Sequence, residues 1–337
     1  MRIKLLIAST DSDYAGHLSN RISELHGEVI DISICSSQER LQELLSNRKF
    51  EAALLEEALT KGVDLSGVKL PLLLWTEDEG ADDTQDGIKR IRKYQRVSSI
   101  VEAILEMYAK VSSDGRGSDP EKAKITAVWS PCGGVGKTSV ALAYAAKKAS
   151  EGKQVLYLDL ELFSSVPVYF NETGKSISSI FEMLENHEGN VRMLIRGIKR
   201  YDSETGIAYF YRPDNYDDMN ILSTENIAEL ISACAGVVEE LVIDMSCSCD
   251  ERAQQVFDCA DRVFVVSDAT YASQTKLLQF ATQHSVYERI KDKTLLVANK
   301  GAIISNTLKG VVISLPIVQS SDASAVYKAL SGCGFEM

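Results

Sequence analysis

The stretch Ile125-Thr-Ala-Val-Trp-Ser130, followed by Pro131-Cys-Gly-Gly-Val-Gly-Lys-Thr-Ser139, decides how the larger part of this chain folds. The first segment is an apolar strand and the second a glycine-rich loop. An Ala-rich helix is predicted next over Val140–Ser150, with Gly152 as its stop. Glycines let backbone N–H groups turn inward around phosphates, and the helix N-terminus adds a partial positive charge. Strand, loop and helix in this order therefore predict a phosphate-binding loop.

The loop also predicts its ligands. Lys137 is expected to reach the β- and γ-phosphates of ATP, and the Thr138 hydroxyl to ligate Mg²⁺. The alternative is a glycine-rich turn with an accidental Gly-Lys-Thr, and two motifs further along the chain argue against it. The residues expected to hold the nucleotide here are Gly133, Gly134, Val135, Gly136, Lys137, Thr138 and Ser139.

Two later strands end in carboxylates. Val155-Leu-Tyr-Leu-Asp159-Leu-Glu161 carries two acids two residues apart, which therefore point the same way along a strand. Leu241-Val-Ile-Asp244-Met-Ser246 has the Walker B pattern, an apolar strand ending in an Asp that holds the Mg²⁺ shell. Either pattern alone is common by chance. All three motifs in this order indicate a nucleotide-binding domain.

More apolar strands are predicted beyond these motifs. They cover Asp261–Ser267, Thr294–Ala298 and Val311–Ser314; the second ends in Asn299 and the third leads to Leu315-Pro316. Strands that are apolar along their whole length are typical of a buried parallel sheet, and ligands gather at the carboxyl ends of such strands.

The N-terminal part alternates short strands with helical patterns. Alternation of this kind implies a parallel sheet covered on both faces. The polar stretch 112–122 is rich in Gly and Ser and is expected to be a linker between domains 1–111 and 123–337. The fold class is therefore α/β, with two doubly wound domains. Strands are predicted at Ile3–Ala8, Val29–Ile34, Ala52–Leu55 and Leu70–Trp75, and helices at Tyr14–Leu25, Gln38–Leu45 and Val97–Tyr108.

The first domain resembles a response-regulator receiver, which is flavodoxin-like, in the order and length of these elements. Receivers accept a phosphoryl group on an Asp that ends the third strand, but here that strand ends in Glu56. The acidic pair expected after the first strand is absent, and Asp11 and Asp13 are expected to cap the following helix. We interpret the domain as an atypical receiver that is not phosphorylated and serves docking or dimerisation. A working phosphoacceptor using Asp11 or Glu56 is the alternative.

Composition limits the function classes. The 337-residue chain has a net charge of −12, which argues against a general nucleic-acid surface. No segment is apolar enough to cross a bilayer, and seven scattered cysteines favour a reduced, cytoplasmic setting. Cys247 and Cys249 lack the further ligands of a zinc site. The densest basic cluster is interpreted as a solvated helix face or loop: Lys89, Arg90, Arg92, Lys93 and Arg96.

Residues 122–337 resemble the MinD/ParA superfamily of deviant Walker A ATPases through the loop and both carboxylate motifs. The resemblance implies that Glu161 orients the attacking water, that Asn299 lies against the adenine, and that Leu315-Pro316 begins the loop that closes over the base. An Asn at a strand end is also a common turn residue. The resemblance implies catalytic roles for Lys137, Asp159 and Glu161 and an Mg²⁺ site at Thr138, Asp159 and Asp244.

Within the superfamily, the architecture is most similar to the CpaE/TadZ proteins of pilus assembly, including a helical stretch from Ile177 to Ile198. This similarity implies an ATP-Mg-stabilised homodimer that binds assembly proteins through the receiver-like domain, in the cytoplasm, at a pole or at the inner membrane face through partners. A MinD-type cell-division regulator and a ParA-type partition ATPase are the alternatives. The segment Lys328–Met337 is too poor in positive charge for a basic amphipathic anchor, so no direct membrane anchor is expected.

Two departures from the superfamily pattern concern hydrolysis. Pro131 and Cys132 stand where the family has Gly and the signature Lys that reaches the partner's nucleotide, and Glu161 stands where it has Asp. Arginine fingers, which place a cation near the γ-phosphate, raise the rate by roughly 10³ or more, so losing such a cation is expected to cost a similar factor. Displacing a positioning group by about 1 Å costs roughly a hundredfold. ATP binding with slow or negligible hydrolysis is therefore predicted.

Overall fold

The computed structural model describes residues 2–27, 29–76, 84–85, 87–111, 123–170, 175–187, 189–304 and 312–335. The chain divides into two compact units: unit 1 is Met1–Gly117 with Glu188–Gly197, and unit 2 is Ser118–His187 with Ile198–Met337. This division places 188–197 with unit 1, whereas the sequence assigned it to the second domain. The predicted linker, 112–122, lies outside the described residues. None of the described helices combines the length and apolarity that crossing a bilayer requires.

Unit 1 contains one twisted sheet in the order β2-β1-β3-β4-β6-β5. All neighbours are parallel except β5 and β6, which are antiparallel. The parallel strands follow the flavodoxin-like order, in which the strand order reverses between β1 and β3. The strands are β1 (Ile3–Ala8), β2 (Ile30–Cys35), β3 (Phe50–Glu56), β4 (Val68–Trp75), β5 (Thr84–Gln85) and β6 (Ile88–Arg92).

Strand β6 corrects the interpretation of the basic cluster. Lys89, Arg90 and Arg92 lie on this strand, and the side chain of Lys93 just after it is only 9% exposed. A solvated helix face or loop was therefore the wrong assignment. The strand was not recognised in the sequence because most of its residues are basic, and only Ile91 of its five residues is fully buried.

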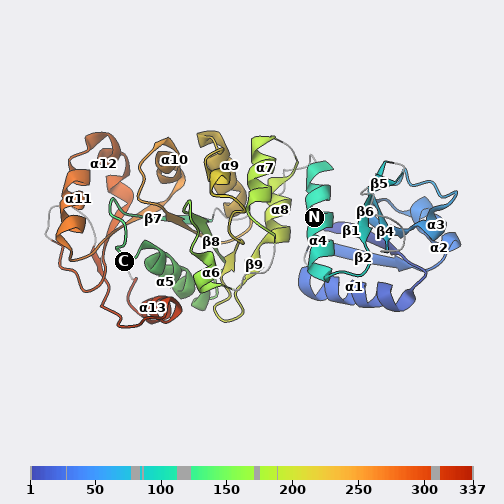
Figure 1. Ribbon diagram of the computed structural model, residues 1–337, viewed down its shortest axis with the longest axis horizontal. Helices are drawn as coiled ribbons and strands as arrows, with labels where there is room; N and C mark the ends of the chain where they lie inside the picture. The colour runs from blue at the N-terminus through green and yellow to red at the C-terminus, as the bar shows by residue number, and fades with distance from the viewer. Residues whose placement is uncertain are drawn as a thin grey trace. The chain divides into compact units, whose positions relative to one another are not determined.

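Helices cover both faces of the unit 1 sheet. Figure 1 shows α1 (Ser12–His26) and α4 (Val97–Val111) on one side, and α2 (Gln38–Asn47) and α3 (Glu57–Thr60) on the other. Each face has its own apolar core. Asp11 caps α1 as predicted, because its carboxylate accepts a hydrogen bond from the Tyr14 N–H at 2.9 Å. Asp13 lies in the first turn of the helix and is not its cap residue.

The predicted helical stretch Ile177–Ile198 is two helices, α7 (Ser178–Glu185) and α8 (Val191–Ile198). The segment of α8 that belongs to unit 1 packs on α4. A Cβ at Gly197 would come within 2.3 Å of the Leu105 Cδ1 atom, so only glycine permits this approach. The Asn190 N–H donates to the carbonyl oxygen of Ala109 at 2.8 Å and fixes the start of the helix.

Unit 2 contains an eight-stranded sheet in the order β14-β13-β12-β7-β11-β8-β10-β9. Its strands pair in parallel except β9 with β10. Every residue of β8 and β11 is buried, which explains their apolar sequences. The strands are β7 (Lys124–Trp129), β8 (Val155–Leu160), β9 (Arg200–Tyr201), β10 (Ala208–Tyr209), β11 (Glu240–Met245), β12 (Arg262–Ser267), β13 (Thr294–Ala298) and β14 (Val312–Ser314).

Helices also cover both faces of the unit 2 sheet. Figure 1 shows α5 (Lys137–Ser150) and α13 (Ala323–Ser331) below the sheet, with α9 (Thr224–Ala235), α10 (Glu251–Cys259) and α12 (His284–Ile290) above it. Tyr327 and Leu330 of α13 are buried in the same apolar cluster as the inner face of α5. Short helices α6 (Val166–Tyr169), η2 (Tyr216–Met219) and η3 (Lys291–Lys293), with α11 (Tyr271–Ala281), complete the unit.

Candidate functional site

The glycine-rich loop joins β7 to α5 at the carboxyl edge of the unit 2 sheet. Gly134 and Gly136 have φ angles of 76° and 92°, which favour glycine because a Cβ is strained there. Gly136 is the N-cap of α5, and its carbonyl oxygen accepts a hydrogen bond from the Val140 N–H at 3.0 Å. The loop therefore presents the N-terminus of a 14-residue helix, whose partial positive charge favours phosphate.

Three carboxylates gather beside the loop. One oxygen from each of Asp159, Glu161 and Asp244 lies within 4.8 Å of the others. The sheet register brings them together, because Asp244 on β11 pairs with Asp159 on β8. Within the described residues this is the one group of three side chains that fits a metal ion, so no such group forms around Cys247 and Cys249.

Hydrogen bonds hold Asp159 and Asp244 in place and leave one oxygen of Asp244 without a partner. Asp159 accepts from the Glu161 N–H at 2.8 Å and from the Ser164 hydroxyl at 2.7 Å. Asp244 accepts from the Tyr157 hydroxyl at 2.9 Å through Oδ2, whereas its buried Oδ1 has no hydrogen-bond partner. A buried, unpaired carboxylate oxygen beside two other acids fits a divalent cation with oxygen ligands such as Mg²⁺.

Burial raises the pKa of all three acids. It raises the pKa of Asp159 to about 6, and the neighbouring Glu161 charge adds to the shift. The pKa of Asp244 lies well above its usual range because of burial and the charges of Asp159 and Glu161, although the nearby Thr138 and Tyr157 hydroxyls lower it in part. The pKa of Glu161 is raised by burial, and the Lys137 ammonium lowers it in part. A cation bound here would relieve the repulsion.

Mg²⁺ affinity is expected to fall as the pH is lowered from about 7.5 to below 6. A raised pKa means that protons bind these carboxylates at higher pH than usual, and protons compete with the metal. Isothermal titration of the nucleotide-free protein with Mg²⁺ measures this effect, because a nucleotide phosphate would itself titrate in this range. The variant Asp261→Asn, which changes a carboxylate at the opposite edge of the sheet, serves as a control. An affinity that does not change over this pH range would contradict the assignment.

Lys137 lies between the loop and the carboxylates. It is 7% exposed, and its Nζ is 3.9 Å from the Glu161 Oε1 atom. A lysine this buried is retained only where an anion or a polar group balances it. The structure thus brings together the predicted loop, Lys137, Thr138 and the three acids.

The predicted base-binding residues occupy different positions. Asn299 is 3% exposed, and its Nδ2 donates to the Val135 carbonyl oxygen at 2.8 Å. The side chain of Leu315 is buried in the core, and its N–H donates to the Ala298 carbonyl oxygen at 2.8 Å. Pro316 is exposed. Asn299 therefore lies at the loop itself, and its role toward adenine stays a prediction.

Comparison with known proteins supports the α/β nucleotide-binding fold of unit 2. No family model matches the chain, and no curated protein sequence matches it. Among solved structures, a ParA family ATPase from Chlorobium tepidum is similar, with a TM-score of 0.52 and 17% identity, covering 63% of this chain and 90% of that chain. Unit 2 therefore has a P-loop NTPase fold like that of this ParA family protein. The septum site-determining protein MinD from Pyrococcus horikoshii, solved with Mg-ADP, has a TM-score of 0.48 and 12% identity, covering 62% and 94% of the two chains.

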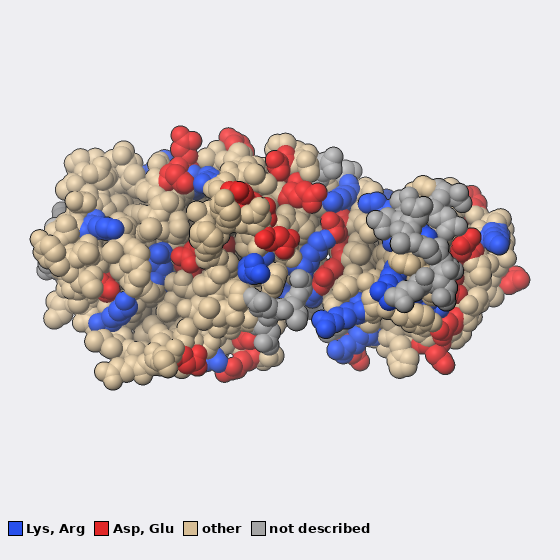
Figure 2. Space-filling view, in the orientation of Figure 1, with Lys and Arg blue, Asp and Glu red and all other residues tan. Residues whose placement is uncertain are grey.

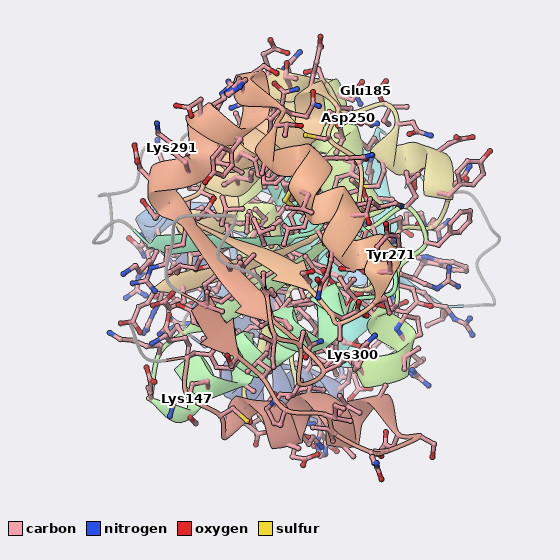
Figure 3. All side chains as sticks on the ribbon, turned by 90° about the vertical axis from the view of Figure 1, so that its left-hand side faces the viewer. Lys147, Glu185, Asp250, Tyr271, Lys291 and Lys300 are labelled. Atoms are coloured by element: carbon pink, nitrogen blue, oxygen red, sulfur yellow. The ribbon has the colours of Figure 1, made fainter. Side chains whose placement is uncertain are left out.

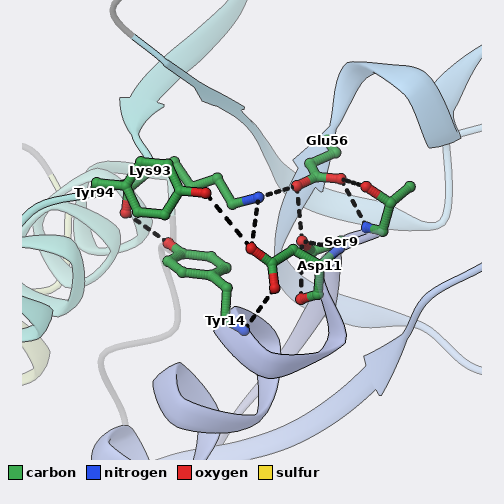
Figure 4. Close-up of polar contacts among 7 residues, drawn as sticks. Ser9, Asp11, Tyr14, Glu56, Lys93 and Tyr94 are labelled. Carbon is green, nitrogen blue, oxygen red and sulfur yellow. Dashed lines mark hydrogen bonds and ion pairs between the residues drawn. The ribbon is translucent and has the colours of Figure 1, made fainter.

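In unit 1, a second polar cluster lies at the carboxyl ends of β1 and β3 (Figure 4). Glu56 accepts hydrogen bonds from the Ser9 hydroxyl at 2.7 Å and from the Thr10 N–H and hydroxyl at 2.7 and 2.6 Å, and it forms an ion pair with Lys93. The Lys93 ammonium also lies 4.8 Å from the ring centre of Tyr14.

Glu56 is ionised because of these partners. Burial alone would raise its pKa, but the hydrogen bonds from Lys93, Thr10 and Ser9 outweigh burial and lower the pKa to about 2. The sequence interpretation missed Lys93, since it was counted with a surface cluster. Its signal was a lysine immediately after a strand in the flavodoxin-like order, which places it at the same sheet edge as Glu56.

Proposed function

We propose that this protein is an ATP-binding switch that localises or assembles a pilus or a related secretion machine. The observation that carries the proposal is the buried Lys137 beside a glycine-rich loop and three clustered carboxylates. ATP with Mg²⁺ would stabilise a homodimer in the cytoplasm, at a pole or at the inner membrane face, and unit 1 would recruit the partner proteins. The pilus assignment rests on the combination of an atypical receiver-like unit with a MinD/ParA-type unit.

ATP and Mg²⁺ are the ligands that the site chemistry favours. Lys137 and the N–H groups of Gly133–Ser139 would hold the phosphates, while Thr138, Asp159 and Asp244 would hold the metal. Mg²⁺ prefers oxygen ligands and usually binds through carboxylates together with substrate phosphates. The unpaired Oδ1 atom of Asp244 supports this arrangement.

Unit 1 would act as a docking module without phosphorylation. Glu56 occupies the end of β3 and is satisfied by Lys93, Ser9 and Thr10. A carboxylate whose charge is already neutralised by a lysine ammonium is a poor nucleophile and a poor metal ligand. Asp11, the other candidate acceptor, caps α1.

The two alternatives are a MinD-type cell-division regulator and a ParA-type partition ATPase. The inner face of α13 packs in the core with α5 and is not available for a membrane. In Figure 2, Asp and Glu side chains gather on the part of unit 2 where Figure 1 draws α7 and α9, and Lys and Arg are scattered singly near α11. Binding to DNA in the presence of ATP, in a gel-shift assay, would favour the ParA-type alternative.

Light scattering after size exclusion tests the switch. The mass is expected to double from that of a monomer when ATP and Mg²⁺ are added, and to return to the monomer value with EDTA. A mass that is the same with and without ATP-Mg²⁺ would contradict a nucleotide-stabilised homodimer.

Hydrolysis is expected to be slow, because Cys132 is a buried thiol that carries no ammonium. Introducing Cys132→Lys together with Glu161→Asp is expected to raise turnover by at least about tenfold, since each change restores a group that acts in the transition state. Phosphate release over hours measures the rate, and Cys259→Lys at the partly exposed last residue of α10 serves as the control. Fast wild-type turnover would refute this prediction.

A further inference from the structure

Two consecutive residues after β13 bind two consecutive carbonyl oxygens of the phosphate loop. The Asn299 Nδ2 atom donates to the Val135 oxygen at 2.8 Å, and the Lys300 Nζ atom donates to the Gly134 oxygen at 2.7 Å. Asn299 is 164 positions from Val135 in the chain, and Lys300 is 166 positions from Gly134, so both contacts are a product of the fold. We call Asn299 and Lys300 the outer clamp.

The outer clamp sets the orientation of two peptide groups. A trans peptide is planar, so its C=O and N–H point in opposite directions. Since the clamp holds the oxygens of Gly134 and Val135, the N–H groups of Val135 and Gly136 point away from it. Backbone N–H groups turned in a common direction form the concave anion site of a phosphate loop.

Lys300 is fixed by more than the loop. Its ammonium is 3.2 Å from the Asp268 Oδ2 atom, and the Asp268 side chain is only 6% exposed. Asp268 follows β12 and is itself held by the Thr270 N–H at 3.1 Å and the Thr270 hydroxyl at 2.6 Å. Figure 3 shows Lys300 and Tyr271 on one side of the unit and Lys147, from the last turn of α5, on the other.

The local backbone is adapted to this contact. Lys300 has a φ angle of 54°, an uncommon conformation for a residue other than glycine, and such conformations persist where surrounding contacts enforce them. On the loop side, a Cβ at Gly136 would come within 2.5 Å of the Asn299 Nδ2 atom. The clamp therefore requires glycine at 136 independently of its φ angle.

We propose that Asn299 and Lys300 are positioning residues that preset the peptides 134–135 and 135–136 to bind the phosphates of a nucleoside di- or triphosphate. The inference rests on the proposed nucleotide binding. The positive charge of Lys300 polarises the peptide it binds and strengthens the N–H donor on the opposite side. The clamp thus acts on the ligand's phosphates through the loop peptides and makes no direct contact with them.

The test compares Lys300→Met, Lys300→Arg and the control Lys291→Met, a lysine of η3 in an exposed pair with Glu288. Affinities for ATP, ADP and adenosine are measured by competition with a fluorescent ATP analogue in Mg²⁺. Lys300→Met is expected to weaken ATP and ADP alike by about tenfold, the effect of one charged hydrogen bond at the low end. Adenosine affinity stays unchanged, Lys300→Arg retains most of the binding, and Lys291→Met matches wild type.

A second variant checks the chain of contacts. Asp268→Asn alone is expected to weaken ATP binding less than Lys300→Met, and to add nothing in the Lys300→Met background, because both act through one contact. ATP affinity equal to wild type in a folded Lys300→Met protein would overturn the inference while leaving nucleotide binding intact. An equal loss for adenosine would also overturn it, because Lys300 would then act at the base. Wild-type protein that binds no ATP would refute the proposed function itself.

Discussion

Replacing Lys137 with Met is expected to weaken ATP binding about a hundredfold or more. Lys137 is 7% exposed and is the buried cation of the loop, so its ammonium would form charged hydrogen bonds to two phosphates. Each such bond contributes about 1.5–3 kcal/mol, and about 2.7 kcal/mol corresponds to a hundredfold in affinity. Met preserves the length and apolar stem of the side chain and removes only the charge.

The matched control for this variant is Lys147→Met on the same helix, at the end far from the loop (Figure 3). Its ATP affinity should equal that of wild type, and both variants should retain the wild-type circular dichroism spectrum. Binding of ATP by folded Lys137→Met within threefold of the control would show that the loop is not the nucleotide site.

Replacing Glu56 with Gln is expected to lower the free energy of unfolding of unit 1 by about 3 kcal/mol. The Lys93 side chain is 9% exposed, and removing one partner of a buried pair leaves the other charge uncompensated, which costs about 3–5 kcal/mol. We take the lower end because Asp11 lies 3.7 Å from the same ammonium. Urea denaturation of the full chain, monitored by hydrogen exchange of the β1 and β3 amides, measures the change in the free energy of unfolding.

Two features of this prediction separate the ion pair from general damage. Glu57→Gln, at the exposed neighbouring position, should leave stability unchanged, and adding Lys93→Met to Glu56→Gln should restore part of the loss. The lowered pKa of Glu56, about 2, means that its contribution is present above about pH 4.5 and is lost as the pH falls toward 2. Equal stability of Glu56→Gln and wild type at pH 7 would contradict the role of the pair.

The site in unit 2 followed from the sequence because each of its parts lies at a strand end. Asp159 and Asp244 end apolar strands, and parallel strands that are both buried align their carboxyl ends. Gly134 and Gly136 of the loop have positive φ angles, a conformation that glycine in the sequence favours. Local pattern and strand direction were therefore sufficient to predict which acids would gather around Lys137.

The residues that sequence reasoning missed depend on contacts between distant segments. Lys300 reaches Gly134 and Lys93 reaches Glu56 only after the strands are placed in order. A lysine after a strand has no local signal that distinguishes a buried partner from solvent. Likewise, no local pattern in Val191–Ile198 indicates that Gly197 lets this helix pack on α4, because the close approach of Leu105 exists only in the folded chain.

The central claim is that the loop, Lys137 and the carboxylate cluster together bind ATP with Mg²⁺. Isothermal titration of the wild-type chain with ATP, in Mg²⁺ and in EDTA, tests it most directly. One ATP per chain is expected with micromolar or tighter affinity in Mg²⁺, and weaker binding in EDTA or in Asp244→Asn, which removes the carboxylate whose Oδ1 atom has no hydrogen-bond partner. No heat of binding in Mg²⁺, or an affinity that EDTA and Asp244→Asn leave unchanged, would contradict the account.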